Sequence, residues 1–366
     1  MSPRPNRASL RGILALVIVC VAWWQGCQWN TDAEMSFERA LFTSAADSTV
    51  ACFRIPALEE TEGVLLAAID ERVPSCADLR GNRNVNILLR RSDDGGRSWM
   101  PAQRILDLPE GVSVSDPSFI VDEQRDRVFL LANLMDHDRA PGQYRFVITH
   151  SDDAGSTWSP LRDITDEVAP STWVDDFMFV TSGHGTQASD GTLLHTVVNL
   201  QRGTFVLMSE DHGLSWKLAA SPVTPADESK IVELDNGTWM VNSRVAGAGH
   251  RWIHESGDRG QTWLSRPDSS LVDPAVNASL INHPEGLVFV NAHHPTDRTN
   301  LELRVSRDEG TTWSGGLVVE PGSAAYASAI VLQDGSVAVF YERADYTENV
   351  FRRIPTDYLP AKDPAP

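Results

Sequence analysis

The residue whose surroundings most clearly suggest chemistry is Arg54. It stands between Phe53 and Ile55 in the run Cys-Phe-Arg-Ile-Pro-Ala-Leu, whereas a lone arginine is more often a solvated surface charge. A guanidinium offers planar, permanently charged, bidentate recognition of a carboxylate. Because the chain has a formal net charge of −19, any site for an anion is a local positive exception.

Composition excludes several other kinds of chemistry. The acidic balance argues against nucleic acid and anionic membrane surfaces as partners. The 10 histidines are scattered, and the adjacent pair His293-His294 has no ligand spacing around it. We therefore expect no metal and no other cofactor.

A pattern of eight residues, S-x-D-x-G-x-[S/T]-W, occurs five times, at starts 47 to 59 residues apart. Its aspartate can accept hydrogen bonds from its own turn, its glycine permits positive φ, and its tryptophan can pack under the turn. We interpret these boxes as staples of hairpins rather than as catalytic groups. The period indicates a repeat architecture. The boxes are Ser92–Trp99, Ser151–Trp158, Ser209–Trp216, Ser256–Trp263 and Ser306–Trp313.

Apolar runs bounded by turn residues precede each box, and such runs are typical of strands. There are six turn-strand units, five of them followed by a box. Small sheets repeated in this way close radially into a propeller. The sequence therefore predicts an all-β, six-bladed β-propeller, whose sixth unit has no box because the chain ends there. The predicted strands are 64–69, 85–90, 128–131, 146–150, 192–198, 204–208, 238–241, 251–254, 287–290, 301–305, 336–341 and one near 350–354.

The N-terminal residues have the composition of an export signal. Three arginines precede the apolar stretch 13–24, which is too short to favour a spanning helix. A lipid-modified Cys27, a plain cleaved signal and an uncleaved anchor all remain open. We expect an exported chain with a leader over 1–34 and a single domain over 35–366.

Two cysteines remain outside the leader, since Cys20 and Cys27 belong to it. An even number of cysteines in an exported chain favours a disulfide between Cys52 and Cys76. Two separate buried thiols are the alternative.

The segment around Arg54 resembles the Phe/Tyr-Arg-Ile-Pro motif of the sialidases. Boxes of this kind also occur in unrelated propellers and binding proteins, but the combination of the boxes with Arg-Ile-Pro is specific. The resemblance extends along most of the chain after the leader, and it is to bacterial-type exo-α-sialidases (neuraminidases) with Asp-box, or BNR, repeats. It implies a glycoside hydrolase on a six-bladed propeller.

The sialidase resemblance implies three arginines that hold the substrate carboxylate. Arg54 matches the first and Arg244, in Val-Asn-Ser-Arg, the second. Arg298, in Asp-Arg-Thr-Asn-Leu, matches the third, and we interpret its neighbour Arg304 as a structural strand residue. Glu342, in Phe-Tyr-Glu, matches a glutamate that orients the first arginine.

The same resemblance makes Tyr326, in Ala-Ala-Tyr-Ala-Ser, the nucleophile. Most glycosidases use a carboxylate, and sialidases with a tyrosine are an exception. The anomeric carbon of sialic acid bears its own carboxylate, which would repel an attacking one. A neutral phenol avoids this repulsion, but with an ordinary pKa of about 10 it needs a base. Glu228, in Asp-Glu-Ser-Lys, resembles the family's base, and the alternative Glu233 reads as structural.

Asp78, in the polar loop after the first long strand, is the expected general acid and base by the same resemblance. Asp70 and Asp116 compete for this role. Asp116, in Ser-Asp-Pro-Ser, resembles a family segment that contacts the sugar's hydroxyls together with the arginine matched by Arg72.

These residues together imply an exo-α-sialidase that releases terminal sialic acid from glycoproteins, glycolipids and oligosaccharides, with retention, without a cofactor and as a monomer. Contact with a membrane is expected only through a lipid on the leader. One alternative is a non-catalytic propeller that binds sialoglycans, and the presence of Tyr326, Glu228 and Asp78 counts against it. A trans-sialidase or an enzyme preferring a deaminated sialic acid would share the site, and the sequence does not separate these.

Overall fold

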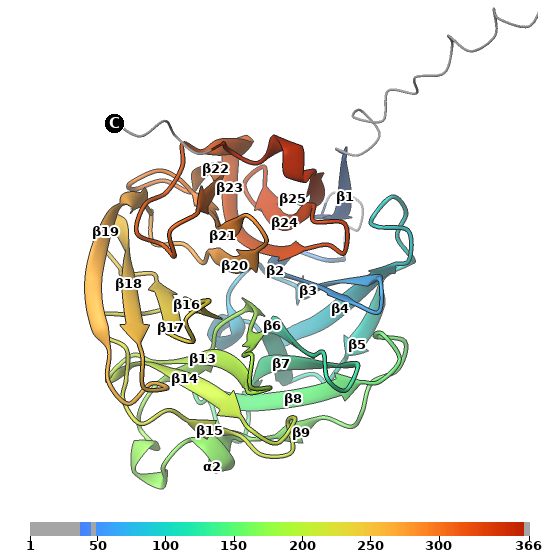
Figure 1. Ribbon diagram of the computed structural model, residues 1–366. Coiled ribbons are helices and arrows are strands. Elements are labelled where there is room, and N and C mark those ends of the chain that lie inside the picture. The colour runs from blue at the N-terminus through green and yellow to red at the C-terminus, as the bar shows by residue number, and fades with distance from the viewer. Residues whose placement is uncertain (1–36, 45–48, 362–366) are drawn as a thin grey trace, which may run out of the picture.

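Strands account for most of the chain. The structure is a computed structural model that describes residues 37–44 and 49–361. Its strands form six sheets arranged around a common centre (Figure 1). The predicted six-bladed propeller is confirmed. In the part of the chain that the structure describes, no helix has the length and apolarity needed to cross a membrane.

Each sheet is built mainly of antiparallel strands, and its first long strand lies nearest the centre. The first sheet contains β2 (Cys52–Thr61), β3 (Val64–Val73), β4 (Asn84–Ser92) and β5 (Gln103–Leu106). The second contains β6 (Val112–Asp122), β7 (Arg127–Asp136), β8 (Arg145–Ser151), β9 (Arg162–Asp163) and β11 (Gly183–His184). The third contains β10 (Met178–Val180), β12 (Thr186–Gln187), β13 (Leu193–Asn199), β14 (Gly203–Ser209) and β15 (Lys217–Leu218). The fourth sheet contains β16 (Ser229–Glu233), β17 (Trp239–Ser243), β18 (His250–Ser256) and β19 (Leu264–Val272). The fifth contains β20 (Ser279–His283), β21 (Gly286–Ala292), β22 (Thr299–Ser306) and the first part of β23 (Leu317–Val331). The sixth contains the rest of β23 with β24 (Val337–Arg343), β25 (Glu348–Ile354) and β1 (Phe37–Thr43). The short helices are α2 (Thr165–Val168), η2 (Leu79–Gly81), η3 (Ser171–Trp173) and η4 (Thr356–Tyr358).

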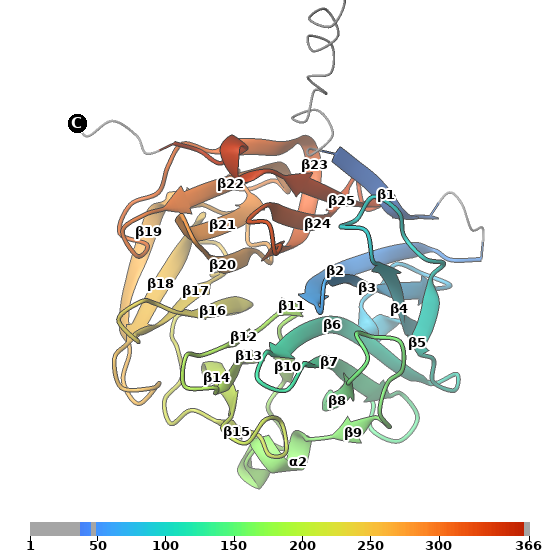
Figure 2. The same cartoon turned by 45° about the vertical axis from the view of Figure 1, so that its right-hand side comes forward.

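Every predicted strand overlaps an observed one, including the last, which is β25. The sequence did not predict β1. This strand pairs antiparallel with β25, from Phe37 opposite Arg353 to Thr43 opposite Glu348, and so completes the sixth sheet (Figure 2). The ring is therefore closed by strands from both ends of the described chain. The predicted leader lies outside the described residues.

The five boxes follow the third strands of their sheets, and the box after β14 shows their geometry. Ser209 Oγ accepts a hydrogen bond from the Gly213 N–H at 2.8 Å, and Asp211 accepts one from the Ser215 N–H at 2.8 Å. His212 and Gly213 both have positive φ, at 60° and 81°. A Cβ on Gly213 would lie only 2.2 Å from Phe129 of the preceding sheet. The boxes therefore hold the hairpins together by hydrogen bonds, as predicted, and also pack closely against the neighbouring sheet.

The hydrophobic core lies between neighbouring sheets. One cluster, for example, joins Leu66 and Leu89 of the first sheet to Phe119 and Leu130 of the second, all essentially inaccessible to solvent. Such close packing around the ring fixes the central strands, whose N-terminal ends all lie on the face opposite the boxes.

Candidate active site

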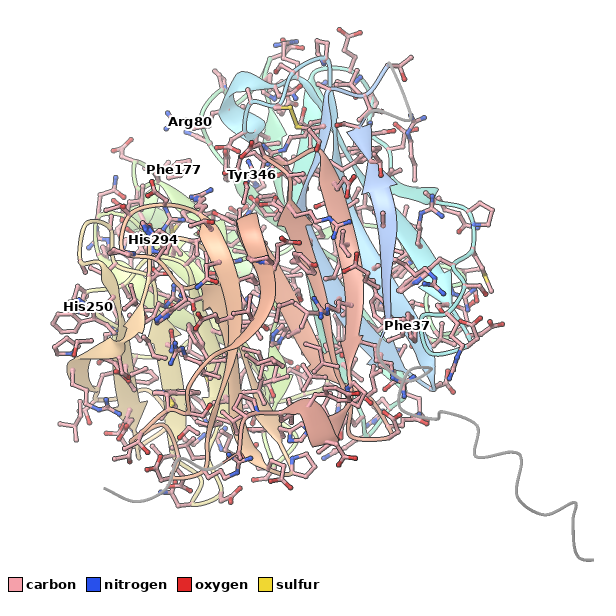
Figure 3. The ribbon with its side chains drawn as sticks, turned by 90° about the horizontal axis from the view of Figure 1, so that it is seen from above. Phe37, Arg80, Phe177, His250, His294 and Tyr346 are labelled. Carbon is pink, nitrogen blue, oxygen red and sulfur yellow. A yellow bond between two sulfur atoms is a disulfide. The ribbon has the colours of Figure 1, made fainter. Side chains whose placement is uncertain are left out.

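A cavity of about 480 Å³ opens on the face where the central strands begin. Seven residues predicted from the sequence meet there from five of the six sheets. Figure 3 shows the labelled residues Arg80, Phe177 and Tyr346 at this end of the molecule, which also carries the disulfide. The predicted residues that line the cavity are Arg54, Asp78, Asp116, Glu228, Arg244, Arg298 and Tyr326.

Irregular backbone aims two of these segments into the cavity. Ile55 and Asp116 have φ of 66° and 62°, although neither is glycine, and each precedes a proline. Strand pairing is interrupted at both points. Bulges and positive φ of this kind cost energy and are common beside active sites. The Arg-Ile-Pro and Ser-Asp-Pro-Ser motifs thus mark places where a central strand bends to present a side chain.

Buried carboxylates hold the bent backbone in place. Glu342, fully buried on β24, accepts hydrogen bonds from the N–H groups of Ile55 at 2.9 Å and Tyr326 at 3.0 Å. It also pairs with Arg54 Nε at 2.7 Å, in line with its predicted orienting role. Burial opposes the charge of Arg54, but Glu342, Tyr326 and Tyr346 together outweigh this effect, so the pKa of Arg54 lies above its ordinary value.

Tyr326 and Glu228 form the pair expected of a phenol nucleophile and its base. The Tyr326 hydroxyl donates to Glu228 Oε2 at 2.7 Å, and the same carboxylate is ion-paired with Arg244. Burial, together with the negative charge of Glu228, raises the pKa of Tyr326 well above its usual value. The phenol is therefore neutral at physiological pH, and an acceptor for its proton already stands in contact with it.

Three guanidinium groups surround Tyr326. Arg244 Nη1 lies 3.2 Å from its hydroxyl, and the guanidinium carbons of Arg54 and Arg298 lie 5.6 Å and 5.4 Å from its ring centre. A carboxylate placed beside the Tyr326 hydroxyl would meet positive charge from three sides. By contrast, Arg304 pairs with Glu302 at 2.6 Å and does not line the cavity.

Asp78 stands at the mouth of the cavity. It immediately precedes the short helix η2 (Leu79–Gly81), its side chain is 80% exposed, and it accepts from Arg72 Nη1 at 2.7 Å. Arg72 is buried and also donates to the Cys76 carbonyl and to Asp70. Arg72, which the resemblance expects to contact the sugar, is not among the residues that line the cavity, and it contacts the Asp78 loop.

A disulfide links Cys52, two residues before Arg54, to Cys76, two residues before Asp78. It joins the first strand of the site to the loop at the mouth of the cavity. Of the two alternatives that the sequence left open, the disulfide is therefore present and the pair of free thiols is not. The loop of Asp78 is thus tethered by a covalent bond and by Arg72.

Asp116 lines the cavity beside Asp70, which is fully buried. Burial raises the pKa of Asp70, but its hydrogen bonds from Arg72, Ser115 and the Asp116 N–H favour its charged form. Burial and this neighbouring charge raise the pKa of Asp116 to about 7. Asp116 therefore lines the cavity as a carboxyl that is partly protonated near neutral pH, a property that sequence patterns do not carry.

An apolar wall completes the cavity and was not predicted. It is formed by Tyr144, Phe177, Phe179 and Leu200, with Arg80 stacked over the Phe177 ring at 5.0 Å. These residues come from loops and short strands of the second and third sheets, where no repeat pattern marks them. Among residues 37–44 and 49–361, no group of three or more histidine, cysteine or acidic side chains is arranged to hold a metal.

Comparison with known proteins is decisive for the family. Residues 65–339 match the family model described as a BNR repeat-like domain. The chain belongs to the family of proteins with this BNR repeat-like domain. It is 34% identical to a sialidase of Micromonospora viridifaciens over 79% of this chain and 50% of that protein, and 30% identical to a sialidase of Bacteroides fragilis over 81% of this chain and 61% of that protein. The chain thus spans about half to three fifths of these two sialidases.

Solved structures of the sialidase family share the fold. The Hadza microbial sialidase Hz136 superposes with a TM-score of 0.79 at 25% identity, covering 88% of this chain and 69% of that one. A leech intramolecular trans-sialidase superposes with a TM-score of 0.76 at 18% identity, covering 88% of this chain and 71% of that one. The fold alone is therefore common to hydrolases and transferases of sialic acid.

Proposed function

We propose that this protein is an exo-α-sialidase that hydrolyses terminal α-linked sialic acids with retention through a tyrosine nucleophile. The observation that carries the proposal is the contact of Tyr326 with Glu228 at 2.7 Å, inside a cavity that three arginines share. The named sialidases to which the chain is similar support the same substrate class.

The first half of the reaction is a displacement at the anomeric carbon. Arg54, Arg244 and Arg298 hold the substrate carboxylate and so fix the anomeric carbon near Tyr326. The Tyr326 oxygen bonds to this carbon while its proton passes to Glu228. The bond to the leaving oxygen breaks, and that oxygen takes the proton of Asp78. The aglycone leaves through the mouth, where Asp78 stands exposed.

The second half reverses the roles. Asp78, now a carboxylate, removes a proton from a water that attacks the anomeric carbon. The bond to Tyr326 breaks, and the phenolate recovers its proton from Glu228. Two inversions give net retention. The positive charge of the arginines and the contact with Glu228 are in place throughout, which agrees with electrostatic preorganisation as a main source of catalysis.

The test is release of a fluorescent phenol from its α-sialoside by the full chain, with the sugar product identified by mass spectrometry and NMR. We expect free sialic acid, formed first as the α anomer. An anhydro sugar would indicate intramolecular transfer instead, and binding without turnover would indicate a sialoglycan-binding propeller. Tyr326→Phe should abolish release, whereas Tyr358→Phe, at an exposed position outside the cavity, should keep it.

A further inference from the structure

Tyr346, on the loop between β24 and β25, contacts two of the three cavity arginines. The guanidinium carbon of Arg54 lies over its ring at 4.1 Å from the centre, closer than the same carbon lies to Tyr326. Its hydroxyl accepts a hydrogen bond from Arg298 Nη1 at 3.3 Å. Its ring packs against the buried cluster that includes Ile55 and Tyr326. One side chain thus connects two guanidinium groups that come from different sheets.

The backbone beneath Tyr346 is held in an unfavourable conformation. Ala344, Asp345 and Tyr346 have φ of 50°, 51° and 69° in succession, and none of them is glycine. The N–H groups of Ala344 and Asp345 bond the carbonyl and the hydroxyl of Ser323. A left-handed backbone conformation costs energy at residues other than glycine, and it persists where the surrounding structure enforces it, often at functional sites. The loop therefore presents the tyrosine in a fixed position.

The partners of the arginines differ in charge. Arg54 pairs with Glu342 and Arg244 with Glu228, so part of their charge is already balanced. Arg298 donates side-chain hydrogen bonds to the Ala275 carbonyl and the Tyr346 hydroxyl, which are both neutral. A neutral acceptor fixes a guanidinium without competing with an incoming carboxylate for its charge.

We propose that Tyr346 is a positioning residue for carboxylate recognition. The Tyr346 ring fixes the orientation of the Arg54 guanidinium by stacking, and the Tyr346 hydroxyl fixes the position of the Arg298 guanidinium by accepting its hydrogen bond. Both contacts are neutral, so the positive charge of the two arginines stays available to the substrate carboxylate. This inference rests on the proposed function, because the carboxylate is that of the sialic acid bound beside Tyr326.

The test compares two ligands in the wild type and three variants. The affinity for a 2,3-didehydro sialic acid and for its carboxamide, which lacks the negative charge, is measured by calorimetry. Tyr346→Ala should weaken binding of the acid about tenfold and leave the carboxamide nearly unchanged, because only the charged group uses the arginines. Tyr346→Phe keeps the ring and should weaken the acid about threefold. Tyr358→Ala, remote from the cavity, should match the wild type.

Each outcome decides between the claims. A folded Tyr346→Ala protein that keeps the wild-type ratio of acid to carboxamide affinity would overturn the positioning role and leave the sialidase proposal intact. A wild type that binds acid and carboxamide equally would overturn both. If Tyr346→Ala does not fold, Tyr346→Phe carries the test: an unchanged preference for the acid would contradict the role of its hydroxyl.

Discussion

At the scale of single residues, the site places positive charge around a neutral tyrosine, which we propose as the nucleophile. Tyr326 is buried and uncharged, its hydroxyl donates a hydrogen bond to Glu228, and Arg244 is within reach of both. Because burial raises the pKa of the phenol, ionisation before attack is disfavoured. In the proposed mechanism, transfer of the proton to Glu228 therefore accompanies formation of the bond to the anomeric carbon, and the geometry of the Tyr326–Glu228 pair is its central requirement.

Arg298 and Arg304 provide a matched pair of substitutions. Arg298→Ala removes the contact that we propose with the substrate carboxylate, so it should lower kcat/KM about 10- to 100-fold, mainly through KM. Arg304 is held by Glu302 and by the Ser314 carbonyl outside the cavity, so Arg304→Ala should change kcat/KM less than about threefold. Steady-state kinetics on a fluorescent α-sialoside measures both values. A larger loss of kcat/KM for Arg304→Ala than for Arg298→Ala would contradict the assignment of Arg298 as the third carboxylate-binding arginine.

The raised pKa of Asp116 predicts how stability depends on pH. The folded state keeps a proton on Asp116 up to about pH 7, whereas the unfolded carboxyl loses it near 3.8. The contribution of this proton to the free energy of unfolding is full at a pH below the pKa of the unfolded carboxyl. It decreases as the pH rises and is lost once the pH has passed the pKa of the folded carboxyl. The free energy of unfolding of the wild type should therefore fall, relative to that of Asp116→Asn, as the pH rises from 4 to about 7. Denaturant unfolding at several pH values measures this difference, and a constant difference would contradict the raised pKa.

At the scale of elements, the boxes and the proposed catalytic groups occupy opposite ends of the same strands. The box after β4 begins at Ser92, which pairs with Leu65 at the start of β3, while Arg72 near the end of β3 supports Asp78. The two functions are therefore separated by the length of a strand. Changes in a box should affect folding and leave the chemistry of folded molecules intact.

Gly213 tests this separation. Gly213→Ala adds a Cβ 2.2 Å from Phe129 Cζ at a residue with φ of 81°, so we expect a loss of about 2–4 kcal/mol in stability. Gly257, in another box, has no atom within 4 Å of an added Cβ, and Gly257→Ala should change stability by less than about 0.5 kcal/mol. Thermal unfolding gives the difference, and kcat of the folded fraction should stay normal in both. Lost turnover at unchanged stability would show that the boxes do more than staple.

At the scale of the whole molecule, the ring closes through β1. Phe42 on this strand is 4% exposed and packs against Phe53 of the first sheet and Phe340 of the sixth. The strand that completes the sixth sheet thus also covers the joint between the first and last sheets. Phe42 thus contacts both the sixth sheet and the residue that precedes Arg54.

Phe42→Ala should lower the free energy of unfolding by about 3–5 kcal/mol, because it removes a buried aromatic ring at the joint. Leu264→Ala, at a 79% exposed position on the outer strand β19, should have little effect. Denaturant unfolding followed by tryptophan fluorescence compares them. Equal stabilities of the two variants would show that β1 does not contribute to closure.

The sequence predicts those parts of the molecule that repeat or that match a motif. The six units and five boxes follow from periodicity, and Arg54, Tyr326 and Glu228 follow from a resemblance to sialidases. The strand β1 escaped prediction because it has no box and pairs only across the closed ring. The contacts of Tyr346 escaped because they depend on three successive left-handed residues that no short motif announces. The inward placement of Arg72 depends on the buried Asp70, which becomes apparent only when neighbouring sheets pack.

The most direct test of the mechanism is covalent labelling of the full chain with a 2,3-difluoro sialosyl donor. Fluorine beside the anomeric carbon slows both halves of the reaction, and the good leaving group at that carbon allows the first half to proceed, so a glycosyl-enzyme should accumulate. Mass spectrometry of the digested protein should find the sugar on the peptide that contains Tyr326, and Tyr326→Phe should remain unlabelled. A label on any other residue, or an active enzyme that forms no adduct, would contradict Tyr326 as the nucleophile.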